Sequence, residues 1–270
     1  NFGIQLASGK DPAKAARSAG AQAIGTYIGN AILPGLGGFV GGALGTMMGG
    51  RVICNELMRQ GIMSRKQVVL DYKFTRDYYE DGIRKHISGY EEYKWMPTRS
   101  IPEALDIKNK FDFNTCVDYG CAKGFLVHAL RIVGCEAYGE DISEYAIDNC
   151  HPSVKDYVSS PTDNVYDLLI CKDVLEHVHE ADIPGVLGKF LRKSNQFFFT
   201  IPLGDNDRFR IREYEVDITH VTKKDEEWWI DMFQSQGLKL VEFSYSFGAI
   251  KEKWIDVDPY GNGFFIMETK

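Results

Sequence analysis

Two acidic residues flank a glycine-rich turn near the middle of the chain. Asp118 ends a short apolar run just before Gly120 and Gly124, and glycine permits a tight turn into a helix. Asp141 follows, and an acid about 20 residues beyond such a turn is positioned to bind the two hydroxyls of a ribose. These residues predict a site for a ligand that contains a nucleoside.

The glycine spacing argues against a dinucleotide as that ligand. A dinucleotide site needs the pattern G-x-G-x-x-G, which brings the backbone to a pyrophosphate at the N-terminus of a helix. Counted from Gly120, the two later glycine positions hold Ala122 and Phe125. The sequence therefore disfavours a pyrophosphate.

The motif D-x-G-x-A-x-G, from Asp118 to Gly124, resembles the first motif of the class I S-adenosylmethionine-dependent methyltransferases. The resemblance extends over residues 71–270, because DLLICKDVLEH at 167–177 is similar to the fourth strand of that family and FFFTIP at 197–202 to its fifth. It implies S-adenosylmethionine as the cofactor, which has no phosphate and whose ammonium group suits Asp118. The implied cofactor-binding residues are Asp118, Gly120, Cys121, Ala122, Gly124, Asp141, Ile142, Lys172, Asp173 and Tyr93.

Ala122 departs from that motif, since many members of the family carry glycine at this position. One added methyl group fits if the backbone lies slightly further from the ligand. The departure therefore bears more on affinity than on the identity of the ligand. A strand-to-helix turn without any ligand is the alternative interpretation.

Aromatic residues upstream of the turn are further candidates for the cofactor site. The segment YEEYKWMP at 90–97 resembles one that closes over the cofactor in some relatives, which makes Tyr90, Tyr93 and Trp95 candidates. Plain aromatic packing is the alternative. The adenine contact is expected after the third strand, and the sequence does not choose among Ser159, Ser160 and Asp163.

Methyl transfer from a sulfonium is an in-line displacement, in which an enzyme aligns the acceptor and, for a hydroxyl, removes its proton. The loops after the fourth and fifth strands offer Lys172, Asp173, Glu176, His177, Asp205, Asp207, Asp217 and His220. His220 is the favoured base, because Asp217 three residues earlier can hold its tautomer. A histidine that caps the next helix or bonds a backbone carbonyl is the alternative. His177 is expected to have a structural or cofactor-lining role.

Arg208, Arg210 and Arg212 occupy alternate positions of the loop after the fifth strand. In an extended segment they would point to one side and clamp an anionic or sugar-phosphate acceptor. A solvated charged loop is the alternative.

Strands alternate with helices along the second part of the chain, which predicts an α/β fold with a mainly parallel sheet and helices on both faces. The expected strands include 116–119, 136–142, 197–202, 238–247 and 263–268, and the expected helices are 125–133, 183–193 and 223–237. The resemblance implies a seven-stranded Rossmann-like methyltransferase sheet with an antiparallel last strand. It also implies that the ligand lies over the carboxyl ends of the parallel strands.

The six cysteines and six histidines do not form a zinc motif. There is no C-x-x-C pair, and His177 and His179 are two positions apart, which splays them on a helix. We therefore expect no metal site, although magnesium held by Asp173 and Asp217, as in some catechol methyltransferases, is compatible with the sequence. The cysteines are expected to be reduced thiols in a protein synthesised in the cytoplasm.

The charge balance disfavours a nucleic acid substrate. The chain has 31 basic and 38 acidic residues and a net charge of −7. Because a broadly basic surface is missing, non-specific attraction to nucleic acid should be weak. A small molecule or a glycan is the expected methyl acceptor.

The N-terminal segment differs chemically from the rest of the chain. No charged side chain occurs from Ser18 to Gly50, and glycines recur at four-residue spacing at Gly25 and Gly29 and again at Gly37, Gly41, Gly45 and Gly49. Such a stripe of small residues lets two helices approach closely. Pro34 leaves arms shorter than the ~20 residues that cross a bilayer. A hairpin, a tilted pair or a self-assembling bundle is predicted for 21–50, with a flexible linker as the alternative.

The predicted organisation is a glycine-zipper segment at 1–50, a junction at 51–70 and a methyltransferase domain at 71–270. The glycine zipper together with ICNELMRQG at 53–61 resembles segments of bacteriophage virion proteins. A second hypothesis follows from this resemblance. In it the chain is a structural or membrane-interacting component of a virion-like assembly, located in a virion or at a membrane, with a methyltransferase-like domain.

Overall fold

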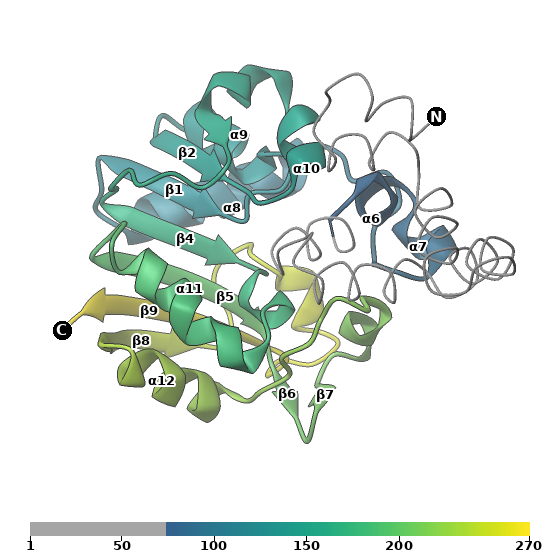
Figure 1. The fold of residues 1–270 in the computed structure, drawn as a ribbon, viewed down its shortest axis with the longest axis vertical. Helices are drawn as coiled ribbons and strands as arrows, with labels where there is room; N and C mark the ends of the chain where they lie inside the picture. Colours follow the sequence, from purple (N-terminus) through teal and green to yellow (C-terminus); the bar gives the residue numbers. More distant parts are fainter. Residues whose placement is uncertain (1–73) are drawn as a thin grey trace, which may run out of the picture. The chain divides into compact units, whose positions relative to one another are not determined.

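A seven-stranded sheet organises residues 74–270, the part of the chain that the computed structural model describes (Figure 1). The strands lie in the order β3 (Val158–Ser159), β2 (Glu136–Glu140), β1 (Thr115–Tyr119), β4 (Leu168–Lys172), β5 (Gln196–Pro202), β9 (Asn262–Thr269) and β8 (Leu238–Ser244). Strands β1 to β5 are parallel, and β9 runs antiparallel between β5 and β8. The predicted mainly parallel sheet with an antiparallel last strand is confirmed.

Helices cover both faces of the sheet, as predicted. One face packs against α8 (Pro97–Lys110) and α9 (Phe125–Ile132), and the other against α11 (Ile183–Phe190) and α12 (Glu226–Ser235), which lie in front of the sheet in Figure 1. The remaining elements are α6 (Arg76–Glu80), α7 (Gly82–Lys85), α10 (Glu144–Asp148), the hairpin of β6 (Gly204–Asp205) and β7 (Arg208–Phe209), and the 3-10 turns η1 (Pro152–Tyr157), η2 (Leu175–His177), η3 (Glu180–Asp182), η4 (Arg212–Val216) and η5 (Glu252–Trp254).

The apolar run of β5 explains how the sheet is buried on both sides. Phe197, Phe199 and Ile201 belong to the core on the α11 and α12 side, whereas Phe198 belongs to the core on the α8 and α9 side. Successive side chains of a strand point to opposite faces, so a strand covered on both faces needs a continuous apolar run. Each fully buried phenylalanine contributes about 1.5–3 kcal/mol.

The ends of α12 are set by local capping. The Asp225 side chain accepts a hydrogen bond of 2.8 Å from the Trp228 backbone N–H, which satisfies one of the first free donors of the helix. Gly237 follows the helix with a φ of +92°, a conformation that commonly ends helices. The helix predicted for 223–237 is therefore confirmed with shorter bounds.

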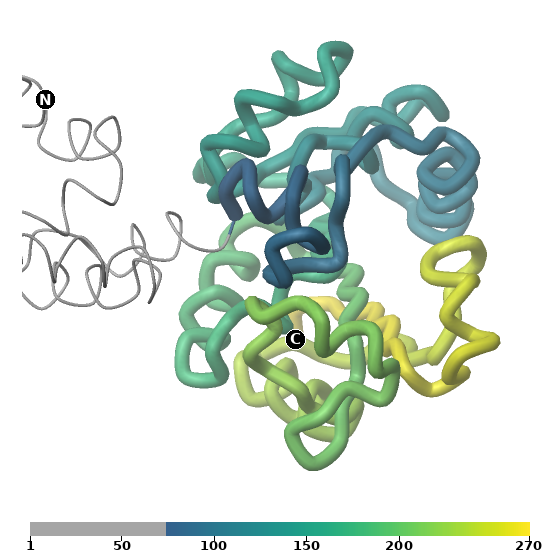
Figure 2. The backbone as a smooth tube through the Cα atoms, turned by 90° about the vertical axis from the view of Figure 1, so that its right-hand side faces the viewer, coloured from purple at the N-terminus to yellow at the C-terminus, as the bar shows by residue number. Residues whose placement is uncertain are grey.

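The first described segment lies beside a loop that is distant in sequence. Figures 1 and 2 show α6 and α7 next to the chain around η4. The Tyr78 hydroxyl donates a 2.8 Å hydrogen bond to Asp217, and the Ile218 N–H donates one of 3.3 Å to the Ile87 carbonyl. These bonds tie α6 and the turn after α7 to the loop that carries the predicted base, His220.

The predicted glycine zipper and the junction at 51–70 lie outside the described residues, as do the first positions of the predicted domain at 71–270. Between residues 74 and 270, no helix combines the length and the apolar character needed to cross a bilayer. The cysteines of this part, Cys116, Cys121, Cys135, Cys150 and Cys171, are free thiols.

Candidate functional site

The glycine turn after β1 has the backbone that its sequence predicts. Gly120 has a φ of +81°, and a Cβ atom added there would lie 2.3 Å from Val174 Cγ2. Gly124 has a φ of +70°, and its Cβ would lie 3.0 Å from Val158 Cγ2. Any other L-residue would be strained at both positions. Ala122, the departure from the motif, also has a positive φ of +50°.

Asp141 follows the end of β2 and closes the turn with both of its carboxylate oxygens. Oδ2 accepts a 2.7 Å hydrogen bond from the Ala122 N–H, and Oδ1 accepts one of 2.7 Å from the Ser143 N–H. Each carboxylate oxygen has a second lone pair, so these bonds leave acceptor positions for two hydroxyl groups. Burial raises the pKa of Asp141 although these N–H groups lower it.

Asp118 lies at the end of β1 as a buried carboxyl group that receives no hydrogen bond from any residue in the range 74–270. Burial raises its pKa to about 7, and Lys172 partly opposes that shift. A buried carboxylate is stabilised by a cation, so this position suits a positively charged ligand group. It is the position that the sequence analysis assigns to an ammonium group.

Two other predicted cofactor residues contribute differently. The Cys121 side chain is buried in the core on the α9 side, so only its backbone can contact a ligand in the turn. Ile142 follows Asp141 and is half-buried. Both stay predictions as ligand contacts.

The aromatic segment packs directly on the turn. The ring of Tyr93 stacks on Phe125 with centroids 5.1 Å apart, and its backbone carbonyl accepts a 3.1 Å hydrogen bond from Lys123. Tyr90 and Tyr93 belong with Ala122 to one apolar cluster. Trp95 instead packs on the ring of His128, with centroids 4.7 Å apart, beside α9. The structure therefore brings Tyr90 and Tyr93 to the turn and places Trp95 beside the helix.

A buried polar cluster follows the carboxyl end of β4. Asp173, with a φ of +59°, forms an ion pair of 2.5 Å with Lys251 and one of 3.4 Å with Lys172. Burial acts to raise the pKa of Asp173, but Lys251 and Lys172 hold it well below its usual range. Lys251 also donates hydrogen bonds to Tyr214 and Asn262, at 3.1 and 2.9 Å. Sequence analysis identified Lys172 and Asp173 but missed Lys251, which comes from a segment with no recognisable motif.

The structure corrects one expectation about His220. Its Nδ1 lies 2.8 Å from the Tyr214 carbonyl oxygen, which can only accept, so this carbonyl and not Asp217 fixes the tautomer. Asp217 Oδ2 lies 3.8 Å from His220 Nε2, which is longer than a hydrogen bond. The Asp217 carboxylate instead accepts hydrogen bonds from Tyr78 and Thr219. Burial lowers the pKa of His220 although Asp217 opposes that effect.

His177 lies against His220, with ring centroids 4.6 Å apart. Its Nδ1 is 2.7 Å from the Thr219 hydroxyl oxygen. Glu176, between the predicted Asp173 and His177, is fully buried, and its two carboxylate oxygens have no hydrogen-bond partner among the described residues. Burial raises its pKa, and Asp173 adds to that shift.

Sequence analysis also missed a buried ion pair at the end of β2. Glu140 accepts hydrogen bonds from Lys193 at 2.9 Å and from the Thr162 hydroxyl at 2.6 Å. The pair fixes the segment after β3, where the adenine contact is expected. The three candidates for that contact, Ser159, Ser160 and Asp163, are all exposed, and the choice among them stays open.

The three alternate arginines do not act as one clamp. Arg210 is held by Asp205, with hydrogen bonds of 2.7 and 2.9 Å, and by Glu226 at 2.8 Å. Arg208 and Arg212 are exposed and line a surface hollow. The structure therefore separates one structural arginine from two that face solvent.

A protein-family model for a methyltransferase domain matches residues 89–243. That match covers more than half of the chain, and the chain therefore belongs to the methyltransferase domain family. The family match makes this chain a methyltransferase by its domain. S-adenosylmethionine stays the methyl donor that the sequence motif implies. No curated protein matches the sequence.

Solved methyltransferase structures are similar in fold. A chain from the complex between the Haloferax volcanii Trm112 methyltransferase activator and a methyltransferase is 12% identical, with a TM-score of 0.50, over 64% of this chain and 90% of its own. Magnesium protoporphyrin IX methyltransferase from Synechocystis PCC 6803 is 14% identical, with a TM-score of 0.49, over 77% and 98%. Mitomycin 7-O-methyltransferase is 14% identical, with a TM-score of 0.48, over 63% of this chain and 54% of its own.

The residues at the turn fit S-adenosylmethionine. The buried carboxyl of Asp118 suits its ammonium group, and Asp141 has lone pairs for the ribose hydroxyls. When bound, this cofactor supplies an electrophilic methyl group on a sulfonium. The chain's own residues then need to hold an acceptor in line with that methyl group and take a proton from it. His220 and Asp217 stay predictions for the second task.

Proposed function

We propose that the protein methylates a small molecule or glycan that carries an anionic group. The observation that supports this acceptor is a surface hollow of about 520 Å³ lined by Arg208, Phe209, Arg212, Glu215 and Val216. Small-molecule sites typically have volumes of about 300–1,000 Å³. Mitomycin 7-O-methyltransferase, which is similar in fold, acts on a small molecule by its name.

The hollow adjoins the predicted base. The Phe209 ring, which lines it, lies 5.2 Å from the His220 ring between centroids. Glu215 is held by Lys223 and by the Phe209 N–H, which leaves the two exposed arginines to determine the charge that a ligand meets. A guanidinium group matches a carboxylate or phosphate through two parallel hydrogen bonds.

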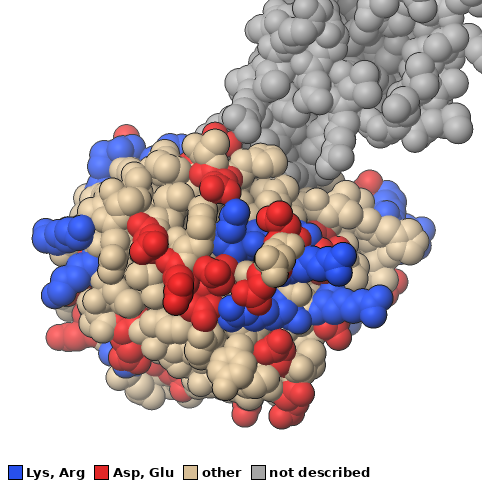
Figure 3. Space-filling view, turned by 90° about the horizontal axis from the view of Figure 1, so that it is seen from below, with Lys and Arg blue, Asp and Glu red and all other residues tan. Residues whose placement is uncertain are grey.

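The surface charge favours one anionic group over a polyanion. Figure 3 shows Lys and Arg interspersed with Asp and Glu on one face of the molecule. The net charge of −7 would repel a nucleic acid at long range. Two arginines at one hollow are sufficient for a single carboxylate or phosphate.

Paired acceptors test this proposal. The purified full chain is given labelled S-adenosylmethionine and acceptors that are identical except for one carboxylate or phosphate group. We expect transfer to the anionic member of a pair, and a KM for it that rises about tenfold for each of Arg208→Gln and Arg212→Gln, from the loss of a hydrogen bond between charged groups. Arg192→Gln, an exposed arginine bonded to the Gly188 carbonyl on α11, is the matched control. Equal transfer to both members, or an unchanged KM in both variants, contradicts the proposal.

We also propose that residues 21–50 provide self-association or membrane contact, in a protein that is synthesised in the cytoplasm and then joins a virion or a membrane. The glycine repeat and the uncharged stretch from Ser18 to Gly50 support this. Flotation with liposomes and sedimentation would compare the full chain with a chain that starts at Asp71. If both chains float and sediment alike, the segment is a linker.

A further inference from the structure

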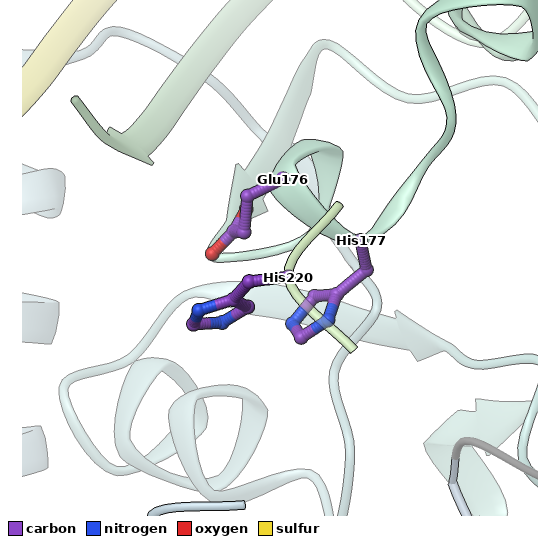
Figure 4. A group of neighbouring side chains, drawn as sticks. All are labelled: Glu176, His177 and His220. Atoms are coloured by element: carbon purple, nitrogen blue, oxygen red, sulfur yellow. The ribbon is translucent and has the colours of Figure 1, made fainter. Parts of the chain in front are cut away.

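We propose that Glu176, His177 and His220 bind a divalent first-row transition-metal ion at the carboxyl edge of the sheet. Figure 4 shows the three side chains converging from two segments, η2 after β4 and the loop before α12. One ligand atom from each residue lies within 4.8 Å of the others. The site is separate from the predicted contacts to S-adenosylmethionine, and it goes beyond the proposed acceptor.

The spacing of the ligand atoms suits a single ion. Nitrogen and oxygen ligands lie about 2.0–2.2 Å from zinc, so two ligands of one ion are roughly 3–4 Å apart. Ligand atoms that all lie within 4.8 Å of one another are close to that spacing.

The environment of Glu176 is the main evidence for a cation at this site. Its side chain is fully buried, and neither carboxylate oxygen has a hydrogen-bond partner among residues 74–270. Lys251, whose charge acts to lower the pKa of Glu176, forms its ion pair with Asp173 at 2.5 Å. Burying a carboxylate without a partner is costly, and metal coordination is one of the few arrangements that offset this cost.

The hydrogen bonds around the two histidines place the ring proton on Nδ1 and leave the lone pair on Nε2. The Tyr214 carbonyl can only accept, so His220 Nδ1 carries the proton and Nε2 the lone pair. The Thr219 hydroxyl donates to Asp217 at 2.6 Å and therefore accepts from His177 Nδ1. Metal-binding histidines typically donate their second ring N–H to a carbonyl or another oxygen in this way. Asp217 and Thr219 are thus positioning residues.

The ligand set defines the class of ion. Two imidazoles and one carboxylate favour zinc, iron, cobalt or manganese over magnesium, which prefers oxygen ligands. Open positions on such an ion would accept an oxygen of the methyl acceptor and favour loss of its proton to solvent. The lone pair of that oxygen would then attack the methyl carbon, and the electron pair of the broken carbon–sulfur bond would return to sulfur.

Metal titration of the full chain tests the site without any activity measurement. The protein is treated with a chelator, dialysed, and titrated with Zn²⁺ in a calorimeter and with Co²⁺ in an absorption spectrometer. We expect one ion per chain and visible cobalt bands of a site with nitrogen ligands. Glu176→Gln and His177→Ala should abolish stoichiometric binding, and Thr219→Val should weaken it about 10- to 100-fold. His179→Gln, an exposed histidine two positions from His177, is the matched control and should bind like the wild type.

Two outcomes overturn the proposal. One is an absence of heat and of cobalt bands with protein that circular dichroism shows to be folded. The other is an unchanged affinity in Glu176→Gln and His177→Ala, which would place the bound ion elsewhere. Because the titration needs no acceptor, failure of the proposed acceptor leaves this result interpretable.

Discussion

Replacement of Asp118 by asparagine should stabilise the folded protein at pH 8 and weaken its binding of S-adenosylmethionine. Burial raises the pKa of Asp118 from 3.8 to about 7. Between these two pH values the folded chain holds a proton that the unfolded chain has lost, so stability falls as the pH rises through this window. Above pH 7 the buried carboxylate of Asp118 is ionised and destabilises the fold by the full amount, and a neutral asparagine at this position does not.

The size of the effect follows from the two pKa values. Their difference corresponds to about 4 kcal/mol in the free energy of unfolding, at 1.36 kcal/mol per pKa unit. For a domain of this size that is roughly 10 °C in Tm. The charges that face Asp118 come from several elements: Lys172 lowers its pKa, and Asp141, Glu103 and Asp173 raise it. The figure is an upper limit, because the new amide also needs hydrogen-bond partners.

Urea denaturation of both proteins from pH 4 to pH 8 measures this difference. The two curves should nearly coincide at pH 4 and separate progressively towards pH 8, with the variant more stable. Asp156→Asn, an exposed aspartate on η1, is the control and should show no such separation. A difference that does not depend on pH would refute the argument that Asp118 is an uncompensated buried carboxyl.

The same substitution, Asp118→Asn, should weaken the binding of the cofactor although it stabilises the fold. The ammonium group of S-adenosylmethionine favours the ionised form of Asp118, so wild-type affinity should fall by up to about tenfold per pH unit below pH 7. Asp118→Asn should bind more weakly at pH 8 and lose this dependence in calorimetric titrations. Equal affinity in both proteins at pH 8 would remove Asp118 from the cofactor site.

Three further substitutions test the turn and the buried ion pair. Gly120→Ala should destabilise the fold by at least about 1–2 kcal/mol in thermal denaturation, from its positive φ alone, with a clash against Val174 in addition. Asp141→Ala should weaken S-adenosylmethionine binding by about 1–3 kcal/mol in calorimetry, and an unchanged Kd would end its assignment to the ribose. Lys193→Met should cost about 3–5 kcal/mol in urea denaturation because Glu140 loses its partner, and adding Glu140→Gln should restore part of that loss.

Much of the fold follows from local sequence patterns. The uninterrupted apolar run at 197–202 predicts a strand buried on both faces, and β5 is one. Asp225 and Gly237 set the ends of α12 through their own backbone and side-chain chemistry. The antiparallel direction of the last strand came from the family resemblance, and the strand order was not predicted, because strand pairing depends on contacts that periodicity does not encode.

The candidate site was predicted only where a motif marked it. The glycine turn and Asp141 are close in sequence, and their hydrogen bonds were foreseeable from spacing. Lys251 and Lys193 were missed, because each meets its carboxylate partner only after the chain has folded over a long distance. The Tyr214 carbonyl, six residues before His220, takes the role that was assigned to Asp217, because the bend of the loop decides which acceptor reaches the ring and the residue types do not.

Buried charge and backbone strain coincide at the carboxyl edge of the sheet. Asp173 and Lys251, the two partners of one ion pair, have φ values of +59° and +60°. Residues other than glycine in this conformation cost about 1–3 kcal/mol each, and they persist where their surroundings fix them. Here the ion pair and the bonds to Tyr214 and Asn262 hold both residues in place. Such strain is expected where polar groups are oriented before a ligand binds, and the charge of Asp173 acts on the carboxyl groups of both Asp118 and Glu176.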